Sequence, residues 1–356
     1  MVDRDPLLWG LRVRGLLLGL ALGDSLGGAH GHFPATGVIR AGVSTQLATF
    51  TTEGIIRAEM RAAHKGICHP PSVVWHAYCR WAVAQGIEVE AMRRRWTIGT
   101  EQSWPDGWLA HVPLLGQRRG SAPATVAALK RLQPGTVENA TSGSRGCHAL
   151  TRTLPVAAVS YTGDHSFAID FAREVAALTH GHPDAHTATA VAVNVAAHCL
   201  TVESFSRAID ACLADSGLEY ATGWMMALDQ AQQAGAKYPR NAGWLARLAP
   251  NATATSALLG GAYVAMSFPD RGNAMDALRF AAGAPDGDSV AAVTGAFLGA
   301  LHGADVWPVD LLSRLELMWV LDTLARDLVL QLTEGPGGTE YTPARDPHWW
   351  DRYPGW

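Results

Sequence analysis

The sequence predicts an all-α protein with a single domain. Alanine-rich apolar segments with helical spacing follow one another along most of the 356 residues. Alternating runs of Val, Ile and Thr, which would indicate strands, are scarce. The segments between the helices are short, and no change of composition marks a domain boundary. We therefore expect one helical domain over residues 8–333, followed by an irregular tail over residues 334–356.

The composition indicates a large core and no basic surface for nucleic acid. Hydrophobic residues make up 48% of the chain, charged residues make up 17%, and the formal net charge is −4. Nucleic-acid backbones require a basic field, so we expect no nucleic-acid partner. Five cysteines without a CxxC pair favour a reducing compartment, and we expect a cytoplasmic protein. One group imitates zinc ligands without a usual zinc spacing: Cys68, His69, His76 and Cys79.

The first predicted helix has a glycine every four residues, at Gly15, Gly19, Gly23 and Gly27. Glycine inside a helix costs about 1 kcal/mol relative to alanine, so such a row indicates close packing against another backbone. The apolar run at residues 16–22 faintly resembles a signal peptide, but it is too short to span a bilayer and lacks a basic leading region. We therefore expect a packed helix and no membrane partner.

Eight further segments have helical period. They are residues 74–84, 167–178, 188–200, 221–234, 255–266, 274–282, 289–302 and 311–332. The helix at 289–302 carries a second row of glycines, including Gly295 and Gly299. If the two glycine rows pack against one another, Asp24 lies near Asp286 and Asp288.

The segment just before residue 290 carries the strongest chemical signal. Asp286, Asp288 and Ser289 place two carboxylates and a hydroxyl within four residues at the mouth of a helix. Hard oxygen ligands of this kind can hold Mg²⁺ or Mn²⁺. The structural alternative is that Asp288 or Ser289 is only the N-cap of the helix and Asp286 lies in the preceding turn.

Four ordered segments together resemble the ADP-ribosylglycohydrolase family. Residues 15–27 are similar to its GDxxG helix, 146–155 to its G-x-MR-x-x-P segment, 177–183 to its A-x-T-H-x-[HD]-P stretch, and 285–292 to its G-D-x-D-[ST]-x-A metal motif. The resemblance implies an orthogonal all-α helical bundle that holds two Mg²⁺ or Mn²⁺ ions. It also implies cleavage of the glycosidic bond between ADP-ribose and an acceptor side chain.

The sequence departs from the family pattern at several ligand positions. The family has two aspartates in an S-D-D-T-Q motif, and both are absent between Ser44 and Thr45. The acidic residue expected after Gly27 is also absent. In the central segment, Thr151 replaces the methionine before the arginine, and His148 replaces a small residue.

These losses change the expected metal content. Two divalent ions would set four positive charges against two carboxylates, which is poor compensation in a closed pocket. We therefore expect at most one Mg²⁺ or Mn²⁺ ion, held by Asp286, Asp288, Ser289 and Thr45. A site without any metal is an equal alternative.

The other candidate site residues fall into two groups. The candidate catalytic residues are Asp286, Asp288, His30, His32 and His148, since histidine can act as an acid or base near neutral pH. For each histidine the alternative is a loop or packing role. By motif match, the resemblance implies substrate contacts from Asp24, Gly146, Cys147, His148, Arg152, His180 and His182.

Three functions remain open. The first is hydrolysis of an N-glycosidic bond in an ADP-ribosylated or related substrate, with reduced or lost metal dependence. The second is a metal-independent enzyme of the same fold, whose pocket of Trp and His residues acts on a different metabolite, for example a hydrophobic one, by His/Asp acid–base chemistry. The third is a non-catalytic protein that binds ADP-ribose or a partner protein. The sequence does not indicate the oligomeric state.

Overall fold

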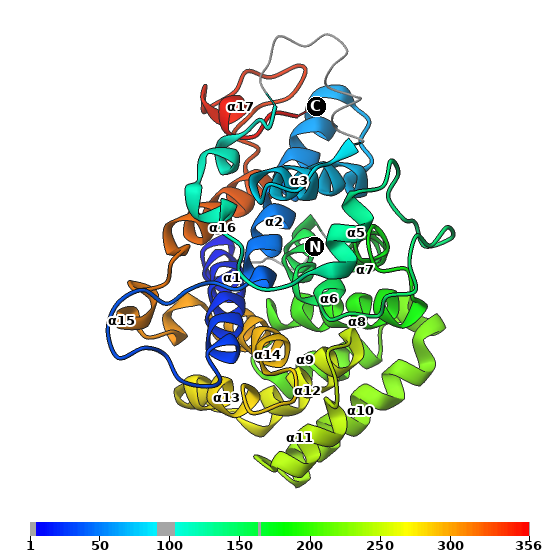
Figure 1. Ribbon diagram of the computed structural model, residues 1–356, viewed down its shortest axis with the longest axis vertical. Coiled ribbons are helices and arrows are strands. Elements are labelled where there is room, and N and C mark those ends of the chain that lie inside the picture. Colours follow the sequence, from blue (N-terminus) through cyan, green and yellow to red (C-terminus); the bar gives the residue numbers. More distant parts are fainter. Residues whose placement is uncertain (1–4, 91–103, 163–164, 356) are drawn as a thin grey trace.

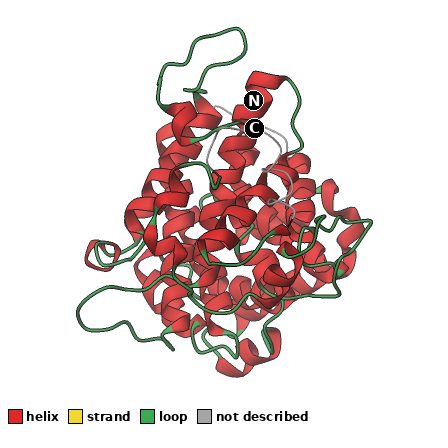
Figure 2. Cartoon of the chain, turned by 45° about the horizontal axis from the view of Figure 1, so that its top comes forward, coloured by secondary structure: helices red, strands yellow, loops and turns green. Residues whose placement is uncertain are grey.

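The structure is a computed structural model that describes residues 5–90, 104–162 and 165–355. In these residues every regular element is a helix, and extended pairing is limited to two isolated bridges, Ile39 with Leu315 and Gly146 with Thr253. The helices pack into one body joined by surface loops (Figures 1 and 2). The predicted all-α, single-domain fold is confirmed.

The α-helices of the described residues are α1 (Pro6–Gly28), α2 (Val43–Lys65), α3 (Pro70–Ala84), α5 (Pro123–Leu129), α6 (His148–Thr151), α7 (His165–Ala177), α8 (Pro183–Cys199), α9 (Phe205–Leu213), α10 (Thr222–Lys237), α11 (Ala242–Leu248), α12 (Ala254–Ser267), α13 (Ala274–Ala281), α14 (Gly287–His302), α15 (Val309–Leu312), α16 (Met318–Thr333) and α17 (Trp349–Arg352). The 3₁₀ helices are η1 (Trp108–His111), η2 (Pro113–Gly116), η3 (Leu154–Thr162), η4 (Ser216–Ala221), η5 (Arg271–Asn273) and η6 (Ala304–Val306).

Helices α1 and α14 form the centre of the fold and face each other through their glycine rows (Figure 1). A Cβ atom on Gly19 would lie 2.1 Å from the carbonyl oxygen of Gly295, and one on Gly299 would lie 1.9 Å from that of Gly15. Any side chain at these positions would force the two backbones apart. The predicted close packing of the two rows is therefore confirmed, and they pack against one another.

The hydropathy of α1 reflects this central position. By length and composition α1 could cross a membrane, but 67% of its most apolar window is buried inside the fold. Its apolar residues contact other helices of the domain, among them α14 and α16. The core contacts thus account for the apolar run that faintly resembles a signal peptide.

Seven of the eight predicted segments each lie on one helix, and the eighth does not. The predicted helix at 311–332 is wrong as a single element, because it breaks into α15 and α16. Between them the backbone pairs with Ile39, whose N–H donates to Arg314 O at 2.8 Å and whose carbonyl accepts from Glu316 N at 2.9 Å. This long-range pairing competes with continued helix, and the local sequence pattern does not reveal it.

The predicted irregular tail is only partly irregular. It contains α17, and the side chains of Trp349 and Tyr353 are fully buried. Tyr353 Oη donates to Asp327 at 2.6 Å, and Arg57 Nε donates to Pro354 O at 2.8 Å. The tail therefore packs onto α2 and α16 as part of the domain, despite its Gly- and Pro-rich start.

Candidate active site

The contact between α1 and α14 brings the end of one helix to the start of the other. A Cβ atom on Gly27 would lie 2.3 Å from the Cα atom of Asp288, so the two backbones touch at this point. Asp24, one turn earlier on α1, is close enough to Asp288 for that charge to raise its pKa. The predicted proximity of Asp24 to the second motif carboxylate is thus observed.

Asp24 is bound to the start of α2. Its Oδ2 atom accepts from the backbone N–H of Thr45 at 2.9 Å and from the Thr45 hydroxyl at 2.5 Å. Thr45 is the third residue of α2, so the carboxylate caps this helix from another element. Burial raises the pKa of Asp24 to about 6, although the bonds from Thr45 lower it. Asp24 therefore holds the start of α2 in place beside the site.

Asp286 precedes the first residue of α14, yet its side chain does not cap the helix. Its Oδ2 atom is buried, and so is the hydroxyl of Ser289, and neither has a hydrogen-bond partner among the described residues. Asp288 accepts from the N–H of Ser289 at 2.9 Å. Capping thus accounts for neither Asp286 nor the Ser289 hydroxyl, and unpaired buried polar atoms of this kind point toward a ligand.

The electrostatic environment favours the neutral form of Asp286. Burial raises its pKa above the ordinary value, and the charge of Asp288 raises it further. The nearby Ser289 hydroxyl and Cys147 thiol lower it. Burial also raises the pKa of Cys147 well above its usual range, with Asp286 adding to the effect. The thiol therefore remains protonated near Asp286 and does not have the character of a nucleophile.

His148 is the residue of α6 that approaches the carboxylates. Burial lowers its pKa to about 4; the charge of Asp288 raises it, and that of Arg152 lowers it. The imidazole is therefore neutral at pH 7. The start of α6 is held by a backbone hydrogen bond, in which Cys147 N donates to Ala252 O at 3.2 Å.

Thr151, which replaces the family's methionine, contacts Ser44, which borders the position of the two absent aspartates. The hydroxyl of Thr151 donates to the hydroxyl of Ser44 at 3.0 Å, and both side chains are fully buried. The sequence pattern marks both positions as lying where the family pattern changes, but it does not pair them. They lie 107 positions apart, so no local signal could have indicated the contact.

Arg152 lies behind the site and has neutral partners. It is fully buried, donates to Thr125 Oγ1, Val175 O and Thr179 Oγ1, and stacks on the Tyr78 ring at 4.4 Å. Burial lowers its pKa. These contacts join α3, α5, α6 and α7, which is a structural role.

The two histidines of the third motif also have protein partners. His180 is buried, its Nδ1 lies 2.8 Å from Thr179 Oγ1, and its ring packs against Gly146. Its pKa is lowered well below the usual value, by burial first and then by Arg152. His182 caps α8, because its Nδ1 atom accepts from Asp184 N at 3.1 Å.

His30 and His32 lie in the loop after α1, and both are exposed. His32 Nδ1 is 3.0 Å from the carbonyl oxygen of His30, which has a positive φ of 52°. Within the described chain, neither histidine makes a hydrogen bond or ion pair with Asp286 or Asp288. The structure thus gathers His148 at the carboxylates and leaves these two on the surface.

The donor atoms fit one hard cation better than two. Asp286, Asp288 and Ser289 offer oxygen atoms, two of which have no hydrogen-bond partner in the described part of the chain. The hydroxyl of Thr45 donates to Asp24, and that of Ser44 accepts from Thr151. In the described part of the chain, the first residues of α2 therefore offer hydroxyls and no carboxylate of their own, and a second divalent ion would be poorly compensated.

A separate open cavity of about 860 Å³ lies beside the start of α2. Val43, Trp81, Arg118 and Lys130 are among its lining residues. None of the site residues predicted from the sequence lines it. Val43, the residue before Ser44, lines this cavity. The sequence pattern did not indicate the cavity.

The comparisons with known proteins agree with these observations. A model of the ADP-ribosylglycohydrolase family matches residues 9–337. The chain belongs to the ADP-ribosylglycohydrolase family. A solved structure described as an ADP-ribosylglycohydrolase-related protein complex has a TM-score of 0.55 and 20% identity, over 91% of this chain and 99% of that chain. At this identity the likeness shows the fold alone. A comparison with curated proteins finds no match.

Membership of the ADP-ribosylglycohydrolase family confirms the resemblance predicted from the four motifs. It supports a glycohydrolase type of function for this chain. Three of the motif segments come together as expected: α1 and α6 both contact α14, and Asp24 of α1 holds the start of α2 beside them.

Proposed function

We propose that this ADP-ribosylglycohydrolase-family protein hydrolyses an N-glycosidic bond in an ADP-ribosylated or related substrate, at the start of α14. The observation that carries this proposal is that Asp286 Oδ2 and the Ser289 hydroxyl, beside Asp288, are buried and have no hydrogen-bond partner of good geometry among the described residues. A carboxylate without a protein partner is costly, so its retention favours a ligand that completes it.

The chemistry follows from the charges of the two carboxylates. Departure of the leaving nitrogen creates positive charge at the anomeric carbon, and a nearby carboxylate stabilises that charge. The raised pKa of Asp286 suits it to donate the proton to the leaving nitrogen. A water molecule supplies the new C–O bond, and Asp288 accepts its proton. Each substrate bond broken is thus balanced by one water consumed.

His148 has a different role in this proposal. With its pKa lowered to about 4, the imidazole is a weak base. Close to Asp288 and neutral, it can hold water or substrate by hydrogen bonds without changing charge. We therefore assign it to orientation and not to proton removal.

The metal requirement follows from the donor set. One Mg²⁺ or Mn²⁺ ion, where present, would be held by Ser289 and the ionised carboxylates of Asp286 and Asp288. It would then supply Lewis-acid polarisation of a substrate oxygen in place of the proton that Asp286 donates in the metal-free site. Thr45 is a poorer ligand because its hydroxyl already donates to Asp24. We propose that the chain holds at most one such ion.

A second candidate function is a metal-independent enzyme for a different metabolite. The Ser44–Thr151 hydroxyl pair favours it, because it closes the α2 side without any charge. The third candidate, a binder without catalysis, would use the same residues. The substrate separates the first two, because only the first releases ADP-ribose, and turnover separates both from the third.

The test is release of free ADP-ribose from a mono-ADP-ribosylated protein, followed by chromatography, with a panel of other N-glycosides in parallel. Asp286→Asn should lower the rate by about 10²–10⁴-fold. Asp276→Asn is the matched control, because Asp276 pairs with Arg279 on the exposed face of α13. ADP-ribose release that EDTA leaves intact would mean that the first function proceeds without metal, whereas turnover of another N-glycoside alone supports the second candidate. No turnover of any substrate would reject both enzymes.

A further inference from the structure

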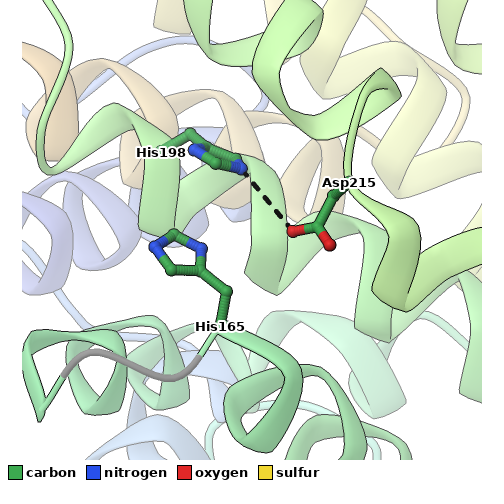
Figure 3. A group of neighbouring side chains, drawn as sticks. All are labelled: His165, His198 and Asp215. Carbon is green, nitrogen blue, oxygen red and sulfur yellow. Dashed lines mark ion pairs between the residues drawn. The ribbon is translucent and has the colours of Figure 1, made fainter.

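Two histidines and an aspartate, none of them part of the candidate active site, meet at the ends of three elements (Figure 3). His165 is the first residue of α7, His198 lies in the last turn of α8, and Asp215 precedes η4. Their ligand atoms all lie within 4.8 Å of one another, and no other such trio of His, Cys, Asp or Glu exists in the described residues. His198 Nε2 is 3.9 Å from Asp215 Oδ2.

A buried amide orients two of these side chains. Asn194, one turn before His198, is 1% exposed. Its Nδ2 donates to Asp215 Oδ2 at 3.1 Å, and its Oδ1 lies 3.3 Å from His165 Nδ1. Since a carbonyl oxygen only accepts, His165 carries its proton on Nδ1 and keeps the lone pair on Nε2. Gly217 N also donates to Asp215 Oδ1, at 2.9 Å.

We propose that His165, His198 and Asp215 bind one transition-metal ion, with Zn²⁺ as the best match. Two imidazoles and one carboxylate are a usual ligand set for Zn²⁺, whereas Mg²⁺ prefers oxygen ligands. Asn194 corresponds to the outer partner that fixes histidine tautomer and carboxylate orientation in metal sites. Three protein ligands leave the fourth tetrahedral position for water or a ligand. The site differs in chemistry from the oxygen donors at Asp286.

Binding requires a modest inward movement. Zn²⁺ bonds of about 2.0–2.1 Å place tetrahedral ligands about 3.3 Å apart, which is closer than the largest present separation. All three side chains are half-buried, and the two rings stack with centroids 4.7 Å apart. Rotation of the half-buried rings at the helix ends can supply this movement.

A purely structural role explains only some of the contacts among His165, His198 and Asp215. Asp215 caps η4 through Oδ1, and a histidine in the last turn of α8 suits the helix dipole. Neither effect requires a second histidine beside Oδ2. The same three residues without metal would be a simple ion-pair cluster, and that is the competing outcome of the experiment.

The experiment titrates Zn²⁺ into the metal-stripped, full-length protein by calorimetry, with Co²⁺ absorption as a second readout. We expect one Zn²⁺ per chain and a visible Co²⁺ spectrum of low-symmetry coordination. His165→Ala and His198→Ala should abolish both signals, and Asn194→Ala should weaken Zn²⁺ binding about 10- to 100-fold. His69→Ala is the control for surface histidines, because His69 is exposed.

Folding of each variant is checked by circular dichroism before titration. Asp288→Asn should leave the Zn²⁺ signal unchanged, which separates this site from the active site. Unaltered affinity in folded His165→Ala and His198→Ala would overturn the proposal. So would a wild-type protein that binds no Zn²⁺, or one whose binding is lost only with His69→Ala.

Discussion

The starts of α14 and α2 lie at the same site but differ in how their polar groups are satisfied. At the start of α14, Asp286 and Ser289 keep buried oxygen atoms without partners in the described chain. At the start of α2, Ser44 and Thr45 are each hydrogen bonded, to Thr151 and Asp24 respectively. The protein itself satisfies the polar groups at the start of α2, whereas two buried oxygen atoms at the start of α14 keep no partner among the described residues. This difference is why we propose that the chemistry lies on the α14 side.

The middle of α2 gives a second contrast on the same helix. Glu53 is fully buried and pairs with Arg57 at 3.1 Å and Arg80 at 2.8 Å, and Asp106 completes the cluster. Two guanidinium groups thus face two carboxylates. This middle part of α2 is therefore structural, whereas the start of α2, where the family's two aspartates are absent, lies beside the candidate site.

The largest expected effect on stability comes from breaking this cluster. Glu53→Gln leaves two buried guanidinium groups with one carboxylate, which should lower the free energy of unfolding by about 3–5 kcal/mol. Urea unfolding measures this loss of unfolding free energy, and Glu340→Gln, at an exposed position of the tail, is the control. A loss below about 1 kcal/mol would show that the cluster is not the anchor of α2.

Asp24 should give a pH-dependent effect of intermediate size. Because its folded pKa of about 6 exceeds the ordinary 3.8, protonation favours the folded state. Its contribution is therefore complete below about pH 4 and is lost as the pH rises through about 6, a change of up to about 3 kcal/mol. Asp24→Asn should remove this dependence, measured as the wild-type-minus-variant difference in unfolding free energy. A difference that is flat with pH contradicts the assignment.

Restoring a carboxylate at the start of α2 should sharpen the contrast. Ser44→Asp adds negative charge beside the site and should tighten Mn²⁺ binding about tenfold, as measured by calorimetry. Ser44→Asn, which adds similar bulk without charge, is the control. Equal affinity in both variants would mean that the α2 side does not reach the ion.

The smallest effect belongs to the hydroxyl pair. Thr151→Val leaves Ser44 without its donor and should cost about 1 kcal/mol of unfolding free energy. Adding Ser44→Ala should cost less than the sum of the two single changes, since both polar groups are then gone. Strict additivity in this double-mutant cycle would show that the two hydroxyls do not interact.

Local patterns predicted much of this arrangement. The glycine rows of α1 and α14 predicted their contact, because glycines one turn apart lower the stability of an isolated helix and are useful where another backbone must approach. From that contact the proximity of Asp24 to Asp288 follows directly. The ordered motifs likewise predicted the family and the grouping of His148 with the carboxylates.

What the sequence could not reveal depends on contacts between distant residues. The break before α16 is caused by pairing with Ile39, and the order of the tail depends on Asp327 and Arg57. His30 lies three residues from Gly27 in sequence, yet the loop turns it to the surface. Nearness along the chain was a poor guide there because the helix ends and the loop changes direction.

The most direct test of the catalytic assignment compares Asp288→Asn with Ser44→Ala in one assay of ADP-ribose release from a mono-ADP-ribosylated protein. Asp288 lies at the start of α14 and Ser44 at the start of α2, so comparing the two variants separates the contribution of α14 to catalysis from that of α2. We expect a loss of about 10²–10⁴-fold for Asp288→Asn and less than about tenfold for Ser44→Ala, with both proteins folded. Equal losses, or a larger loss for Ser44→Ala, would contradict the assignment of catalysis to the α14 side.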